Sequence, residues 1–204
     1  GGGVVGCAVA RALSARWRDV FLLEQLPRLG MAASSRNSGV IHSGIYYAPG
    51  SLKARHCVRG NQLTYEFCAA HNVPHRRAGK LVVATLPEEE AELSALAERG
   101  RANGVEGLRL VDRARIRERE PHIAGRAALE VPSTGIVSSE ELVKAYARIA
   151  AEQGASLLTH ARVTRLEPAR ECIRVAAQIG DSQDSASLTE EAIEARCVVN
   201  AAGL

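Results

Sequence analysis

The sequence predicts an α/β fold in which a parallel sheet is interrupted by an inserted unit of different character. Three observations support this expectation. A helical pattern over residues 4–17 is followed by the apolar run Val20-Phe21-Leu22-Leu23, and a second helical pattern over 138–154 is followed by short strands. The block 73–134 between them has a different texture. Helices that alternate with strands are typical of a parallel sheet with covered faces.

In the first half of the chain, each expected element follows from a local pattern. Small and apolar residues recur at helical spacing over 4–17. The apolar run 20–23 is typical of a short buried strand, which ends at Glu24. The stretch 27–50 is rich in Ser, Gly and Asn, which favour turns. A helix is then expected over 51–72 and a strand over 77–85.

The second half opens with a helix over 87–103, because Thr85-Leu86-Pro87-Glu88 forms a capping box with an early proline. The mixed-charge segment 112–120 is expected to form a short helix that Pro121 stops. Ser138-Ser139-Glu140-Glu141 opens a further helix, which ends near Gly154. Strands are expected at 127–131, 155–159, 162–168, 171–177, 190–195 and 197–200, with a hairpin tip at 180–187, and the consecutive short strands predict a β-meander.

Composition and charge exclude several classes of protein. The 204 residues are 46% hydrophobic and 24% charged, which is the balance of a globular chain rather than of a disordered, collagen-like or coiled-coil one. The net charge is only +3 and no block of Lys or Arg occurs, which argues against a nucleic-acid partner. No apolar run is long enough to span a bilayer and no signal peptide is present, so no transmembrane segment is expected.

The cysteines predict a reducing compartment and no metal site. The chain has 5 cysteines and no CxxC pair, which suggests free thiols in a cytoplasmic type of compartment. Cys57 and Cys68 share a face of the expected helix 51–72, but they lie about 16 Å apart along its axis at ~1.5 Å per residue. They therefore cannot bind one metal ion together. The abrupt ends, on three glycines and directly after an apolar strand, predict a piece of a longer protein.

The motif Gly1-x-Gly3-x-x-Gly6 has the spacing of a dinucleotide-binding turn. The first glycine permits the tight turn, the second a close approach of the pyrophosphate, and the third close packing of helix on strand. Glu24 ends the next strand, near the interval of about 20 residues at which an acidic residue accepts hydrogen bonds from a ribose. The alternative is a glycine-rich turn with a surface glutamate. Because the glycine turn, the helix, the next strand and the acidic residue follow one another at the expected spacing, we expect dinucleotide binding.

The segment from Ser34 to Tyr47 is a second candidate binding region, because many of its side chains can contact a ligand. Residues 34–39 combine hydroxyls, an amide and a guanidinium, all of which pair with phosphate or with the edge of a flavin ring. Gly39 and Gly44 permit a close approach of the backbone. Taken alone, the segment is equally compatible with an ordinary polar loop.

The run 37–60, NSGVIHSGIYYAPGSLKARHCVRG, resembles the L-2-hydroxyglutarate dehydrogenase group of the FAD-dependent, D-amino-acid-oxidase-like oxidoreductases. Three further stretches resemble that group in the same order, and residues 198–204 are similar to the second FAD motif of the superfamily. The three stretches are 79–84, 107–112 and 133–137. The resemblance covers essentially the whole chain, and the run 37–60 is its most specific part.

The resemblance implies a Rossmann-like FAD-binding domain with a parallel sheet and a β-meander, plus part of an inserted α+β substrate domain. The FAD domain is expected over 1–72 and 135–204, and the partial substrate domain over 73–134. Glu24 would hold the adenosine ribose and the backbone of Val163 would meet the adenine, so replacing Glu24 is expected to weaken FAD retention without unfolding the domain. The residues expected to contact FAD are Gly1, Gly3, Gly6, Glu24, Ser35, Arg36, Asn37, Ser38, Gly39, Val163 and Gly203.

Oxidation of a 2-hydroxy acid needs a base for the hydroxyl proton and a cation for each carboxylate. His42 is the candidate catalytic base, since an imidazole pKa of about 6.5 suits neutral pH. The alternative is that His42 only packs or forms hydrogen bonds beside the flavin. Lys53 and Lys80 are candidate partners of the substrate carboxylates, although a surface location explains each lysine equally well. Tyr47 is a further candidate contact, either lining the pocket or packing under it.

The resemblance thus implies the N-terminal half of an FAD-dependent 2-hydroxy-acid dehydrogenase that converts L-2-hydroxyglutarate to 2-oxoglutarate. Two alternatives stay open. One is another amine, amino-acid or glycerol-3-phosphate oxidoreductase of the same superfamily, and the other is a non-catalytic dinucleotide-binding fragment. The electron acceptor is unknown, with a quinone or oxygen as candidates. The expected location is the cytoplasm, either free or at the periphery of a membrane.

Overall fold

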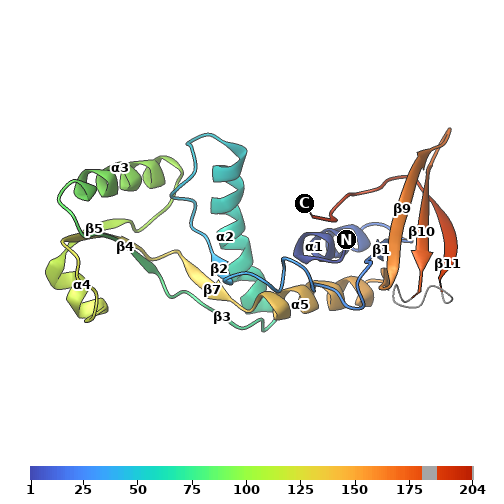
Figure 1. The fold of residues 1–204 in the computed structure, drawn as a ribbon, viewed down its shortest axis with the longest axis horizontal. Helices are drawn as coiled ribbons and strands as arrows, with labels where there is room; N and C mark the ends of the chain where they lie inside the picture. Colours follow the sequence, from blue (N-terminus) through green and yellow to red (C-terminus); the bar gives the residue numbers. More distant parts are fainter. Residues whose placement is uncertain (181–187, 204) are drawn as a thin grey trace. The chain divides into compact units, whose positions relative to one another are not determined.

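The computed structural model describes residues 1–180 and 188–203, and the chain divides into two compact units (Figure 1). Unit 1 comprises Gly1–Ser38 and Ser139–Leu204, and unit 2 comprises Gly39–Ser138. These bounds differ from the domains expected from the sequence, because residues 39–72 belong to the compact unit 2. The functional division into an FAD domain and a substrate domain remains a prediction.

Unit 1 is built around the parallel pair β1 (Phe21–Leu23) and β8 (Ser156–Leu158), in which Leu22 lies opposite Leu157. Helices α1 (Val4–Ser14) and α5 (Ser139–Glu152) pack against each other and against this pair. Their contact is made by small side chains such as Cys7, Ala10 and Ala150, which allow the helices to approach closely. The prediction of a parallel α/β arrangement is therefore confirmed.

The β-meander of unit 1 is also confirmed. Strands β9 (Ala161–Pro168), β10 (Ile173–Ile179) and β11 (Thr189–Ala195) form an antiparallel sheet in the order β11-β10-β9. The strand expected at 197–200 is wrong, since these residues form no ladder within the described part of the chain. Apolar Val198 and Val199 suggested a strand, but a strand also needs a partner. Of the expected hairpin tip 180–187, all but Gly180 lies outside the described residues.

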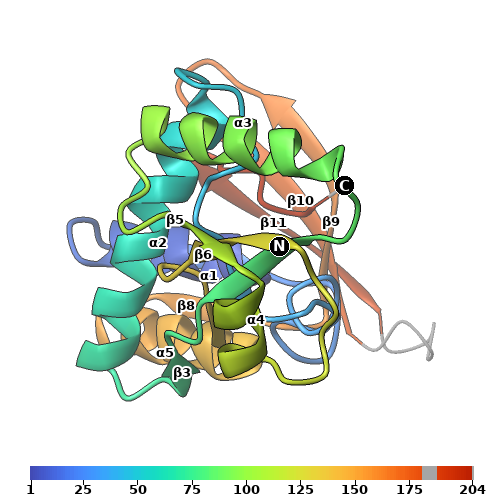
Figure 2. The same ribbon diagram turned by 90° about the vertical axis from the view of Figure 1, so that its left-hand side faces the viewer.

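Unit 2 contains two small antiparallel sheets. The first has the order β4-β6-β5, with α3 (Glu89–Ala102) lying along it (Figure 2). Its strands are β4 (Lys80–Ala84), β6 (Ala127–Val131) and β5 (Arg109–Asp112). The second has the order β2-β7-β3, from Val40–Ile41, Gly135–Val137 and His75–Arg76. Strands β2, β3, β5 and β7 were not expected, because two to four residues carry no measurable alternation.

The remaining helices of unit 2 begin at side-chain caps. Ser51 caps α2 (Leu52–Ala70) by accepting from the N–H of Ala54, and Asp112 caps α4 (Arg113–Arg119) in the same way. The capping box expected at Thr85 and Glu88 is shifted by one residue. The Glu89 carboxylate accepts from the N–H and hydroxyl of Thr85 and from the N–H of Leu86. These hydrogen bonds stabilise the anion and lower the pKa of Glu89.

Candidate functional site

The glycine motif forms the start of α1 in unit 1. Gly3 is the N-cap residue and has extended backbone. A Cβ atom on Gly6 would overlap the carbonyl oxygen of Gly1, and a Cβ on Gly1 would overlap the backbone of Ala201 and Ala202. The chain segment near the C-terminal end thus lies against the motif, as Figure 1 shows beside α1. Glycine is required here because backbone meets backbone, which is the close approach that the motif predicts.

Glu24 follows β1 and points its carboxylate into the base of this turn. Its Oε2 atom accepts from the N–H of Gly2 at 2.6 Å, and its Oε1 atom accepts from the N–H of Leu26 at 2.8 Å. The side chain is buried. Burial raises the pKa of the neighbouring Cys7 to about 11, with a smaller contribution from the Glu24 charge, so this thiol is protonated at neutral pH. Glu24 therefore organises the glycine turn.

The segment that follows supplies a helix cap that the sequence reasoning missed. Ser34 accepts the N–H of Val4 at 2.9 Å through its hydroxyl oxygen, and this oxygen would lie 3.1 Å from a Cβ on Gly3. Ser34 is the neighbour of the predicted Ser35, and the sequence gives no reason to prefer one of these hydroxyl groups over the other. Side-chain caps of this kind satisfy the backbone donors of a first helical turn.

The predicted cofactor residues 35–38 are exposed, and Gly39 is half-buried. Ser35 donates to the carbonyl of Ala32, while the Asn37 amide donates to two carbonyls and accepts from Ser139 at the start of α5. The segment is therefore a hydrogen-bonded turn with its outward face open. Arg36 and Ser38 are also exposed, and Gly39 has a φ of +63°.

The last two predicted FAD residues lie elsewhere in unit 1. Val163 is in β9, opposite Ala177, and its side chain is exposed. Gly203 has a φ of +89°, a backbone conformation that favours glycine, and it follows the residues that touch the glycine motif. Within unit 1, the structure brings Gly203 and the motif to the same region, and it leaves the roles of these residues as predictions.

The candidate catalytic residue His42 lies directly after β2 in unit 2, with an exposed side chain. Its carbonyl oxygen accepts from the Asn61 amide at 3.0 Å and from the Cys57 thiol at 3.6 Å. Burial raises the pKa of Cys57, and the nearby charge of Lys80 opposes this increase. Cys57 thus contacts the backbone of His42, and the charge of Lys80 acts on its thiol.

The two candidate lysines each lie over one of two adjacent tyrosines. Lys80 in β4 donates to the Tyr46 hydroxyl at 3.1 Å, with its Nζ atom 4.4 Å from the centre of the ring. The Nζ atom of Lys53 lies 5.0 Å from the centre of the Tyr47 ring. From the sequence, Tyr46 has the same two interpretations as its neighbour Tyr47, lining the pocket or packing under it, and the structure adds its bond to Lys80. Two cations, each beside a phenol ring, suit a ligand that carries negative charge.

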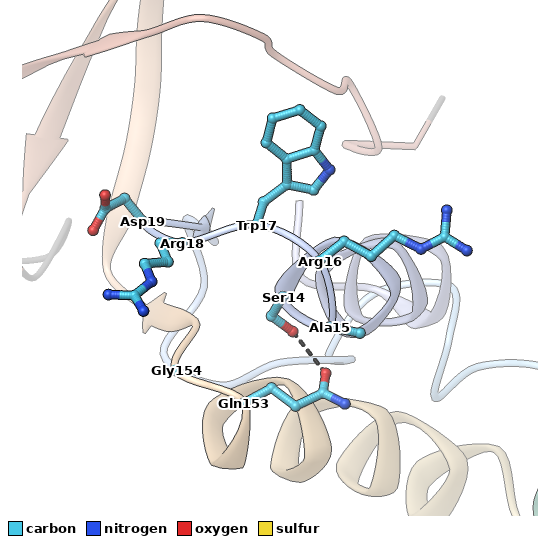
Figure 3. Close-up of a pocket in the computed structure, with 8 residues that line it drawn as sticks. All are labelled: Ser14, Ala15, Arg16, Trp17, Arg18, Asp19, Gln153 and Gly154. Atoms are coloured by element: carbon cyan, nitrogen blue, oxygen red, sulfur yellow. Dashed lines mark hydrogen bonds between the residues drawn. The ribbon is translucent and has the colours of Figure 1, made fainter.

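Neither of the two surface hollows described coincides with the glycine turn. One, of about 410 Å³, is at the far end of α1 from the motif (Figure 3). There, the Ser14 hydroxyl donates to Gln153, and Trp17 extends away from this bond. The other, of about 420 Å³, lies beside α3 and β4 and includes Tyr46. No predicted FAD contact lines either hollow.

The described residues contain no group of three or more His, Cys, Asp or Glu side chains arranged to hold a metal ion. Across residues 1–180 and 188–203, none of the helices is both long enough and apolar enough to cross a bilayer. All five cysteines are free thiols.

Comparison with known sequences gives consistent results across the whole chain. The L-2-hydroxyglutarate dehydrogenase of Nematostella vectensis is 41% identical over 100% of this chain and 46% of its own length. The bovine enzyme, from Bos taurus, is 45% identical over 84% of this chain and 37% of its own length. Both are named as mitochondrial proteins. The chain therefore spans less than half the length of these relatives.

Solved structures show the same fold. The FAD-bound L-α-glycerophosphate oxidase of Mycoplasma pneumoniae matches 96% of this chain and 50% of its own chain, with a TM-score of 0.84 and 25% identity. Glycine oxidase from Geobacillus kaustophilus matches all of this chain and 54% of its own, with a TM-score of 0.82 and 24% identity. The family model for FAD-dependent oxidoreductases matches residues 1–204. With its glycine turn, buried glutamate and parallel strand pair, this chain belongs to the FAD-dependent oxidoreductase family.

Proposed function

We propose that the chain is the FAD-binding part of an enzyme that oxidises L-2-hydroxyglutarate to 2-oxoglutarate. The observation that carries this proposal is the 41–45% identity to L-2-hydroxyglutarate dehydrogenases over 84–100% of the chain. The glycerophosphate and glycine oxidases share the fold at only 24–25% identity, which favours the 2-hydroxy acid over their substrates. A non-catalytic fragment remains the second candidate, because the chain spans under half of its relatives.

The residues at the start of α1 fit an FAD. The turn has no side chains at Gly1, Gly3 and Gly6, and added Cβ atoms at the first and last of these would collide with backbone. The N-terminal end of a helix attracts the negative charge of a pyrophosphate. The Glu24 carboxylate uses two of its roughly four acceptor positions on backbone N–H groups, which leaves capacity for ribose hydroxyls. When bound, FAD supplies a hydride acceptor.

The side chains of unit 2 supply the acid–base and binding chemistry that the reaction needs. Oxidation removes a hydride from C2 of the substrate and a proton from its hydroxyl, leaving a carbonyl. An imidazole nitrogen of His42 accepts the hydroxyl proton. The ammonium groups of Lys80 and Lys53 pair with the two carboxylates, and the Tyr46 hydroxyl orients Lys80. Tyr47 borders the same ligand.

Replacement of His42 tests this assignment. In the complete polypeptide, His42→Gln should slow the reduction of FAD by L-2-hydroxyglutarate by about 10²–10⁴-fold, measured as anaerobic stopped-flow bleaching. FAD content should stay unchanged, because all of the residues expected to contact FAD except Gly39 lie in unit 1. His56→Gln, at an exposed histidine of α2, is the matched control and should keep the wild-type rate. A wild-type rate in His42→Gln would assign the base elsewhere, and loss of FAD would make His42 structural.

The reoxidation step and the location follow the same proposal. We expect a quinone or molecular oxygen to reoxidise the flavin, and parallel assays of quinone reduction and oxygen uptake distinguish the two. A cytoplasmic location, free or peripheral to a membrane, remains a prediction, and fractionation of cells that express the complete polypeptide tests it.

A further inference from the structure

The segment 42–47 carries three residues of the candidate substrate site, but it has no regular secondary structure. It lies between β2 and α2, where its own backbone makes neither a helix nor a ladder. Polar backbone groups in such a segment need partners from outside it. Side-chain amides of two asparagines provide them.

Asn61 holds the beginning of this segment. It lies in α2 with only 7% of its surface exposed, and its Nδ2 atom donates to the carbonyl of His42 at 3.0 Å and to the carbonyl of Ser133 at 2.9 Å. Both N–H bonds of the amide are thereby used. The bond to Ser133 ties the backbone of His42 to the turn after β6, which the Tyr65 hydroxyl also contacts.

Asn103 holds the rest of the segment. This residue follows α3, and its Nδ2 atom donates to the carbonyl of Gly44 at 2.9 Å and to the carbonyl of Tyr47 at 2.8 Å. Between these two anchor points, Ile45 is completely buried in the core that contains Leu129 and Val131. A buried apolar side chain thus fixes the middle of the segment, while the two amides fix its carbonyl groups.

The chemistry of these positions explains why asparagine is needed. In each case one amide nitrogen must donate twice: Asn61 joins carbonyls from two distant parts of the chain, and Asn103 joins two carbonyls within the segment 42–47. Leucine has a similar size but no donor, and an ionised aspartate has the same shape but only acceptors. Either replacement removes the amide donors from partly buried carbonyls, which is unfavourable, although the carbonyls of His42 and Ser133 retain the Cys57 thiol and the Tyr65 hydroxyl as donors.

We propose that Asn61 and Asn103 are positioning residues of the candidate substrate loop, with Asn61 setting the place of His42 and Asn103 that of Tyr47. This inference rests on the proposed function. It assigns different consequences to the two residues. Misplacing the base by about 1 Å slows catalysis by about 10²-fold, whereas misplacing a tyrosine that borders the ligand weakens substrate binding.

Two measurements on the complete, FAD-loaded polypeptide test the proposal. The first is hydrogen–deuterium exchange of the peptide that spans 42–47. In Asn61→Leu and in Asn103→Leu this peptide should exchange about tenfold faster, while peptides from β9 and β10 of unit 1 should be unchanged. Gln62→Leu is the matched control, since Gln62 is the exposed neighbour of Asn61 in α2 and contacts Arg59 at the surface.

The second measurement is flavin bleaching as a function of L-2-hydroxyglutarate concentration. Asn61→Leu should lower the limiting rate about 10²-fold with little change in the half-saturating concentration. Asn103→Leu should raise the half-saturating concentration about tenfold with a smaller effect on the limiting rate. If the leucine variants do not fold, Asn61→Asp and Asn103→Asp keep the shape of the side chains and should show the same two patterns.

The outcomes separate the proposal from the function on which it rests. Unchanged exchange of the 42–47 peptide in folded variants overturns the positioning role, whether or not the substrate is correct. Faster exchange with unchanged bleaching overturns the link between this loop and the reaction. Failure of the wild-type protein to oxidise L-2-hydroxyglutarate refutes the proposed substrate alone, since the exchange measurement needs no substrate.

Discussion

Replacement of Glu24 separates its role in folding from its role in binding FAD. Its two carboxylate oxygens accept from the backbone N–H groups of Gly2 and Leu26, and Gly2 is buried. Glu24→Ala removes both acceptors. Glu24→Gln keeps one carbonyl oxygen but turns an amide N–H toward one of the two backbone donors. The sequence predicts that replacing Glu24 leaves folding intact. The structure changes this expectation, because both replacements remove hydrogen bonds and should lower the stability of the fold.

The magnitude follows from the number of hydrogen bonds. A hydrogen bond to a charged group contributes about 1.5–3 kcal/mol to stability. Glu24→Ala should lower the free energy of unfolding by about 3 kcal/mol, the low end for two such bonds, because the bond to Leu26 is only partly buried and hydration after its loss offsets part of the cost. Glu24→Gln should lower it by about half as much. Loss of charged acceptors for the ribose should weaken FAD binding by about tenfold or more in either variant.

Urea denaturation followed by circular dichroism measures the first effect, and FAD titration of the folded proteins measures the second. Glu171→Ala is the matched control, since Glu171 is exposed in the turn between β9 and β10. Wild-type stability in Glu24→Gln would refute the folding role. Wild-type FAD affinity in a folded Glu24 variant would remove this carboxylate from the cofactor site.

Three further predictions follow from contacts in the two units. Gly6→Ala should destabilise unit 1 and abolish FAD absorbance, because the added Cβ would overlap the backbone. In the control Gly60→Ala, the added Cβ meets no atom within 4 Å, and thermal unfolding should show a protein more stable by about 0.4–1 kcal/mol. The free energy of unfolding should fall as the pH rises from 9 toward about 11, because the folded pKa of Cys7 is raised and the thiol of the unfolded chain ionises first. Urea denaturation at increasing pH measures this fall, which should be absent in Cys7→Ala. Lys80→Met should raise the half-saturating concentration of L-2-hydroxyglutarate about tenfold with FAD content unchanged, and an unaltered value would exclude Lys80 and its bond to Tyr46 from substrate binding.

Much of the fold could be predicted from the sequence, because its main signals are local. Helices α1, α2, α3 and α5 have caps or apolar spacing that a short window contains, and they form where expected, with ends that differ by a few residues. The strand β6 matches its expected range of 127–131. The short strands β2 and β7 could not be predicted, since each exists only through its pairing with a distant segment.

The candidate cofactor site could also be predicted in part, because part of its signal is local in the sequence. The glycine spacing and the acid at the end of β1 are a sequence pattern, and the structure places Glu24 at the glycine turn. Ser34 could not be chosen over Ser35 from the sequence, because only the folded chain brings one hydroxyl to the N–H of Val4.

The sequence by itself thus determined the α/β class, the glycine turn with its carboxylate, and the family, since these depend on residue type and spacing along the chain. Only the tertiary structure decided that Lys80 lies over Tyr46 and that Asn61 and Asn103 hold the loop of His42. The contacts of Lys80 with Tyr46 and of Asn103 with Gly44 join residues 34 and 59 positions apart. The contact of Asn61 with His42 joins residues 19 positions apart. Such pairs leave no periodic trace in a sequence, because burial and chain closure, rather than local propensity, bring the partners together.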